Sequence, residues 1–195
     1  MKTITIRLIT LLSALSFSGV SLAHTGLETG NGLMSGVLHP LTGIDHLVFM
    51  LVVGLWAARG SNKQKWIPLM VLPLFMLIGA VCAYAGISFA GIEVSIALSV
   101  MVMGLFILSG MNVQTGSVAV IAFFALFHGQ AHMLEISVIA SPLVYSLGFL
   151  LTSCSLLMAG LGVGHRLHRV YSEGILRVTG LITGSFGAFL LLNAS

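Results

Sequence analysis

Two histidines and one carboxylate recur at helical spacing in residues 127–135, FHGQAHMLE. On a helix of 3.6 residues per turn, offsets of four and seven place His128, His132 and Glu135 within about 60° of one another. This stretch closes an apolar run that begins near Val118, so we expect these side chains at membrane depth. Ionisable groups inside a bilayer are costly and are typically functional. The spacing therefore predicts a stripe of metal ligands on a transmembrane helix.

A second group of candidate ligands, His39, Asp45 and His46, precedes the first apolar run of the chain. His39 and His46 are seven residues apart and share one helix face, whereas Asp45 lies about 100° from His46 on an ideal helix. Two interpretations follow. Either Pro40 and Gly43 break the helix here, or Asp45 orients a ligating ring without binding the metal itself.

These side chains offer imidazole and carboxylate but no thiolate. Such a set suits Ni²⁺, Co²⁺ or Zn²⁺ without selecting among them. Only neutral imidazole binds a metal, so we expect binding to weaken as the pH falls below about 6.5. A single intramembrane histidine is often only a hydrogen-bond donor between helices. Several histidines and acids gathered at one end of a bundle favour a functional site instead. Cys82 and Cys154 lie within apolar runs and are expected to pack as small apolar residues.

The composition excludes a soluble globular chain. Of the 195 residues, 57% are hydrophobic and only 7% are charged, whereas charged residues approach a quarter of ordinary soluble domains. The apolar runs are continuous and do not alternate with period two, so they favour helices over a membrane β-barrel. We therefore predict an all-α membrane protein, a bundle of six transmembrane helices. The basic residues flank these helices, so the net charge of +3 indicates no nucleic-acid partner.

Residues 1–23 have the pattern of a cleaved signal peptide: a basic start, a short apolar core and the small residues Ser21 and Ala23 around the expected cleavage site. Cleavage would make His24 the first residue of the mature protein. Its free amine and ring could then chelate a cation together. Residues 24–195 are expected to form a single polytopic membrane domain.

Six spans are predicted at approximately residues 34–58, 66–88, 92–109, 117–134, 138–163 and 175–193. With the mature N-terminus in the periplasm, all Lys and Arg residues after the signal peptide fall in or flank two cytoplasmic connections, in agreement with the positive-inside rule. These residues are Arg59, Lys63, Lys65, Arg166, Arg169 and Arg177. We therefore expect an inner-membrane location, with both ligand groups and a further acid, Glu93, at the periplasmic side.

The last predicted span carries glycines at positions 180, 184 and 187, a spacing typical of close helix packing. Such a Gly-rich face could also join two copies of the chain, so a homo-oligomer is one expectation. The lipid bilayer and a transition-metal ion are the other expected partners.

The two ligand groups also carry a resemblance to a known family. Residues 39–46, HPLTGIDH, resemble the H-P-x-x-G-x-D-H signature of the HupE/UreJ family of hydrogenase and urease accessory membrane proteins. Residues 127–135 resemble that family's F-H-G-x-A-H-G-x-E signature, with Met133 where the family has Gly. The resemblance covers most of the chain, including the six-span layout. It implies a nickel or cobalt permease, with the metal held by His39, Asp45, His46, His128, His132 and Glu135.

We therefore expect a permease for nickel, and possibly cobalt, that supplies hydrogenase or urease maturation. Glu93 and His24 are secondary candidate ligands. We expect no enzyme activity and no permanently bound cofactor, the divalent metal being the cargo. One alternative is an intramembrane metal-dependent hydrolase, because His128 and His132 have the spacing of the H-E-x-x-H helix, although Gly129 replaces its glutamate. Another is a bis-histidine haem protein.

Overall fold

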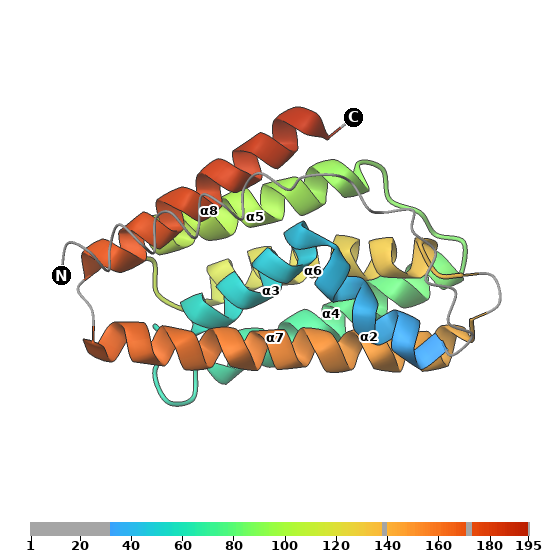
Figure 1. Cartoon of the computed structure of the whole chain (residues 1–195), viewed down its shortest axis with the longest axis horizontal. Helices are drawn as coiled ribbons and strands as arrows, with labels where there is room; N and C mark the ends of the chain where they lie inside the picture. The colour runs from blue at the N-terminus through green and yellow to red at the C-terminus, as the bar shows by residue number, and fades with distance from the viewer. Residues whose placement is uncertain (1–31, 138–139, 171–172, 195) are drawn as a thin grey trace.

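Every regular element is an α-helix in residues 32–137, 140–170 and 173–194, which the structure, a computed structural model, describes. Figure 1 shows the seven helices of this part of the chain, which confirm the predicted all-α class. Residues 1–23, the predicted signal peptide, and His24 lie outside the described residues. The helices are α2 (Gly32–Thr42), α3 (Ile44–Ala57), α4 (Trp66–Tyr84), α5 (Ile92–Leu108), α6 (Thr115–Leu134), α7 (Pro142–Val170) and α8 (Glu173–Asn193).

Four of these helices, α4, α6, α7 and α8, are long and apolar enough to cross a membrane. The bent pair α2 and α3 passes the same test when it is taken as one span. α5 is an apolar helix as a whole, but its 17 residues rise only about 25 Å, less than the hydrocarbon thickness of about 30 Å. The chain is thus a multi-pass helical protein with four to five candidate spans, and six spans remain a prediction.

The first predicted span is two helices and not one. α2 and α3 meet at Gly43 with a bend of 78°. Pro40 lies inside α2 and has no N–H to donate to the preceding turn. Gly43 then adopts an extended conformation (φ −81°, ψ 104°) and begins α3 as its N-cap. Of the two interpretations of this segment, the helix break is therefore observed.

Close backbone contacts at glycines decide which helices are neighbours. A Cβ on Gly129 of α6 would clash with the carbonyl of Met76 on α4. A Cβ on Gly180 or Gly187 of α8 would clash with backbone atoms of α5. Figure 1 shows α5 and α8 side by side along their length. The Gly-rich face of α8 is thus occupied by α5 within one chain, and the predicted homo-oligomer remains untested.

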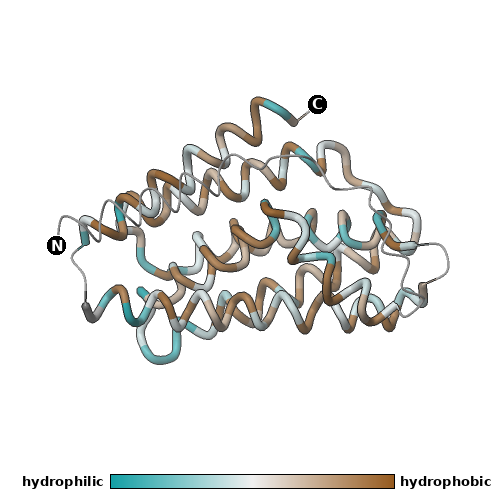
Figure 2. Tube along the Cα trace, viewed as in Figure 1, coloured by the Kyte–Doolittle hydropathy of each residue, from teal (hydrophilic) through white to brown (hydrophobic). Residues whose placement is uncertain are grey.

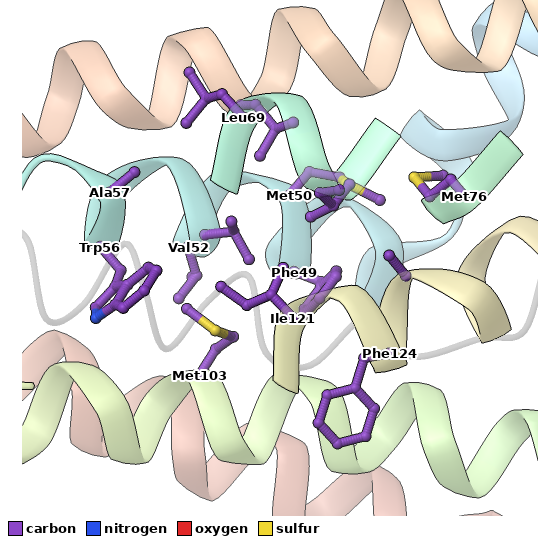
Figure 3. Close-up of a cluster of buried hydrophobic side chains, with 14 of the residues drawn as sticks. Phe49, Met50, Val52, Trp56, Ala57, Leu69, Met76, Met103, Ile121 and Phe124 are labelled. Atoms are coloured by element: carbon purple, nitrogen blue, oxygen red, sulfur yellow. The ribbon is translucent and has the colours of Figure 1, made fainter. Parts of the chain in front are cut away.

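Large apolar side chains fill the space between α3, α4, α5 and α6. Figure 3 shows Phe49, Trp56, Met76, Met103 and Ile121 directed into this common core. Each of these side chains is at most 1% exposed. Phe49 and Trp56 follow His46 along α3, and Ile121 precedes His128 along α6. The core therefore extends from the candidate ligands toward the opposite end of the bundle.

The basic residues lie at that opposite end. Thirteen residues of helical rise, about 20 Å, separate His46 from Arg59. Arg59 donates to the carbonyl of Gly110 at 3.2 Å and pairs with Glu173 at 2.9 Å. Figure 2 shows the loop after α3, which contains Lys63 and Lys65, as a hydrophilic turn beyond the apolar helices. The bundle therefore has one end with histidines and acids and one basic end.

Candidate metal site

Four histidines from three helices form one continuous cluster. His39 comes from α2, His46 from α3, and His128 and His132 from successive turns of α6. The His46 ring centroid lies 4.7 Å from those of both His128 and His132, and the His39 centroid lies 4.8 Å from that of His132. Residues more than 80 positions apart in the sequence thus meet, as the two sequence patterns predict. We call these four rings the histidine cluster.

Two phenylalanines fix the planes of the α6 rings. Phe49 of α3 stacks on His128 with centroids 4.3 Å apart and planes inclined by 6°. Phe149 of α7 stacks on His132 at 4.8 Å and 8°. A ring held by a stacked neighbour loses much of its freedom to tilt. The apolar core therefore orients the histidine cluster as well as closing the bundle beneath it.

Carboxylates hold the other two rings. Asp45 accepts a hydrogen bond from Nδ1 of His46 at 2.8 Å, so it orients a ring as the second interpretation proposes. Glu135 pairs with Nε2 of His39 at 2.9 Å. That hydrogen bond stabilises the charged form of Glu135 and holds the pKa of its carboxyl below the usual value. Glu135 lies just beyond α6, 52% exposed, and is therefore an anion at the edge of the site at neutral pH.

Of the two secondary candidates, Glu93 lies exposed in the first turn of α5. Within the part of the chain that the structure describes, it makes no hydrogen bond or ion pair with the histidine cluster. The structure thus brings six candidates into one site and leaves Glu93 outside the direct contacts, while His24 is not among the described residues.

Several ring nitrogens of the cluster have no partner. Among the described residues, Nε2 of His46, Nδ1 of His128 and both nitrogens of His132 are buried without a hydrogen bond. His46 is 6% exposed, and His128 and His132 are not exposed at all. Buried polar atoms are nearly always hydrogen-bonded, because leaving one unpaired costs about 1–3 kcal/mol. Four such atoms in one cluster indicate a place built for a ligand that supplies the missing bonds.

The rings are not yet arranged as a coordination shell. As the described side chains stand, no group of three or more His, Cys or acidic residues is placed to hold a metal ion. The rings meet edge to face, with interplanar angles of 67–81° around His46, so their nitrogens do not converge on one point. Neither nitrogen of His132 has a partner among the described residues, so rotation of this ring breaks no hydrogen bond with them. Binding a cation therefore requires ring rotation within the cluster.

Three polar residues at this site escape the sequence analysis. Ser99 of α5 lies 2.9 Å from Nε2 of His128. The buried hydroxyl of Tyr145 on α7 has no partner among the described residues, and its ring centroid lies 6.0 Å from that of His39. The fully buried Gln130 bonds to the backbone of Ile87 and Phe89 at 2.7 and 2.8 Å. A polar residue inside an apolar helix is the signal that could have identified Ser99.

Gly129 has a packing role that bears on the hydrolase alternative. Because a Cβ at this position would clash with the Met76 carbonyl, α6 cannot carry a larger residue there without moving away from α4. A glutamate at the H-E-x-x-H position would not fit. The rings of His46 and His128 are in contact, with centroids 4.7 Å apart, so the observed arrangement leaves no room for a macrocycle between these two rings, and the haem alternative stays untested. Met133, beside His132, is 8% exposed and packs within the apolar core.

Comparisons with known proteins identify the family of the chain. A family model described as "HupE / UreJ protein" matches residues 12–190. The chain is similar to Protein HupE of Rhizobium leguminosarum bv. viciae, with 32% identity over 188 residues, which cover 96% of this chain and 98% of that protein. No solved structure matches the chain.

Proposed function

The chain belongs to the HupE/UreJ family, and from this premise we propose that it is a permease for a divalent transition metal, nickel or cobalt. It would carry the cation from the periplasm across the inner membrane for the maturation of a hydrogenase or urease. The observation that carries the proposal is the histidine cluster, with four buried ring nitrogens that lack a partner in the described residues. A cation passing through would supply their missing bonds.

The donor set supports a borderline divalent cation. Neutral imidazole binds nickel, cobalt and zinc well, and carboxylates add charge without the tight hold of a thiolate cage. A conducting site must also release its ion, which favours moderate affinity. The two carboxylates that contact the cluster, Asp45 and Glu135, can neutralise the incoming charge or keep orienting His46 and His39.

The acids also support entry from the histidine end. Glu135 and His39 are 52% and 24% exposed, so this pair lies at the boundary between solvent and the buried rings. Asp45, Glu93 and Glu135 give this end negative charge, whereas Arg59, Lys63 and Lys65 lie at the other end. A cation is attracted to a mouth of opposite charge. Entry from the periplasm therefore agrees with the predicted orientation.

The apolar core supports a mechanism with a closed inner half. Phe49, Met50 and Trp56 follow the cluster along α3, and all three side chains are fully buried (Figure 3). No hydrated cation passes through packed apolar side chains. Transport would therefore require the helices below the cluster to separate after the cation has bound. Because the segment is broken at Gly43, α2 and α3 are separate helices that point in directions 78° apart.

Uptake of radiolabelled nickel into cells tests the proposal. We expect His128→Ala and His132→Ala to lower the initial uptake rate at limiting nickel by at least about tenfold, since each removes a buried donor. His165→Ala is the matched control, because His165 is at the basic end of α7 and bonds to the carbonyl of Leu161. Equal uptake by wild type and both cluster variants, at equal protein levels in the membrane, would remove the claim for this site.

Binding by the purified protein tests selectivity. We expect nickel and cobalt to bind the wild-type protein with one ion per cluster and the two alanine variants to bind weakly. Zinc serves as the comparison cation, since the same donors suit it. A protein that takes up and binds none of the three metals would contradict the proposed function.

A further inference from the structure

Among the described residues, Ser99 makes the only hydrogen bond between α5 and the histidine cluster. Its side chain is fully buried, as is that of His128. The Ser99 hydroxyl oxygen lies 2.6 Å from the carbonyl oxygen of Ile96 and 2.9 Å from Nε2 of His128. A small polar side chain thus joins the α5 backbone to a candidate metal ligand on α6.

Counting hydrogens gives each contact a direction. A serine hydroxyl has one hydrogen to donate. Two oxygens 2.6 Å apart require a hydrogen between them, and the Ile96 carbonyl has none. The Ser99 hydrogen therefore goes to Ile96. Its oxygen can then meet Nε2 of His128 only as an acceptor, so that nitrogen must carry a proton.

Nδ1, the other nitrogen of the His128 ring, then carries no proton. A neutral imidazole has one N–H and one lone pair. With the proton on Nε2, the lone pair is on Nδ1, which is buried and without a partner among the described residues. Phe49 stacks on the ring and limits its tilt. The ring thus has a defined plane and a defined donor side.

We propose that Ser99 is a positioning residue that holds neutral His128 as the Nε2–H tautomer and so makes Nδ1 its metal-binding atom. The metal-binding half of this proposal rests on the proposed function, whereas the tautomer half does not. Metal-bound histidines commonly donate their second nitrogen to a polar group that fixes the ring. Asp45 does this for His46 through Nδ1, and Nε2 of that ring has no partner among the described residues. Ser99 would fix the His128 ring in the same way, but through Nε2, which leaves Nδ1 to bind the metal.

Nitrogen NMR of the ¹⁵N-histidine-labelled full chain in lipid nanodiscs tests the tautomer without any metal. His128→Gln identifies the His128 signals by their loss. At a pH where the rings are neutral, we expect wild type to show a protonated Nε2 and an unprotonated Nδ1 for His128. We expect Ser99→Ala to show a mixture of both tautomers. Ser99→Thr, which keeps the hydroxyl, should restore the wild-type pattern.

A titration with diamagnetic Zn²⁺ then tests which nitrogen binds. We expect the Nδ1 signal of His128 to move and Ser99→Ala to weaken Zn²⁺ binding by about tenfold. Ser109→Ala is the matched control, because Ser109 makes the same bond to the third preceding carbonyl at the other end of α5 without touching a histidine. It should leave the tautomer and the affinity unchanged.

The outcomes separate the two proposals. A wild-type His128 protonated on Nδ1 would overturn the role of Ser99 whatever the variants do. An unchanged tautomer and affinity in a folded Ser99→Ala protein would overturn it as well. Wild type with the expected tautomer but without binding of Zn²⁺, Ni²⁺ or Co²⁺ would contradict the metal-binding half and the proposed function, while the tautomer assignment would stand.

Discussion

One carboxylate oxygen of Asp45 accepts two hydrogen bonds from His46, one from ring Nδ1 at 2.8 Å and one from the backbone N–H at 2.7 Å. The bend at Gly43 makes this possible, because it starts a new helix whose first-turn N–H groups have no partner in the preceding turn. Asp45 thus stabilises the start of α3 and fixes the His46 ring at the same time. With Nδ1 held by Asp45, Nε2 of His46 faces the site without a partner in the part of the chain that the structure describes.

Asp45→Asn should weaken metal binding by about 10- to 100-fold, the usual cost of removing a group that orients a ligating histidine. The amide keeps the size of the carboxylate but removes its charge and weakens its hydrogen bond to Nδ1. Glu93→Gln is the comparison, since it removes an equal charge from the same end without touching a ring. Calorimetric titration with nickel measures both. Equal losses in the two variants would show that charge alone matters and would contradict an orienting role.

Glu135→Gln should lower uptake several-fold at limiting nickel and much less at saturating nickel. Its carboxylate holds His39 at the exposed edge of the cluster, so its charge acts on capture. An exposed charge is screened by salt, so the difference from wild type should shrink at high ionic strength. Glu173→Gln is the control, because it removes an exposed carboxylate that is paired with Arg59 at the basic end. A lowered maximal rate with unchanged half-saturation would contradict a role in capture.

Nickel uptake should rise as the pH is raised from acidic to neutral. A cation and a proton compete for the same imidazole lone pair. Protonation therefore removes ligands as the pH falls, and a protonated cluster would also repel a cation. Initial rates in membrane vesicles, with the same pH on both sides, measure this effect without a proton gradient. Uptake that is flat or falls over this interval would contradict binding by neutral histidines.

Gly129→Ala should destabilise the protein by about 1–3 kcal/mol, the usual cost of overpacking a well-packed contact. Its methyl group would clash with the Met76 carbonyl and push α4 away from α6. The clash would occur between the cluster histidines His128 and His132 of α6. Gly116→Ala is the matched control on α6, since nothing lies within 4 Å of a Cβ there. Thermal unfolding in detergent compares the two. Equal melting temperatures would show that α4 and α6 are less tightly packed than described.

Much of the candidate site could be predicted from local patterns. The four-residue spacing of His128 and His132 requires one helix face, because helical geometry depends only on separation along the chain. Pro40 and Gly43 indicate a break, because proline lacks an N–H donor and glycine is a poor helix former. The family signatures lie in the same two segments, and the comparisons confirm the resemblance. These conclusions need no knowledge of which helices are neighbours.

Only the tertiary structure decided the partners of each ring. Ser99, Phe49 and Phe149 come from three different helices, and no spacing within one helix relates them to His128 or His132. The role of Gly129 was hidden for the same reason, since a glycine between two histidines does not reveal the α4 backbone against it. Side-chain periodicity determines which face a residue shares, whereas packing between helices determines what that face meets.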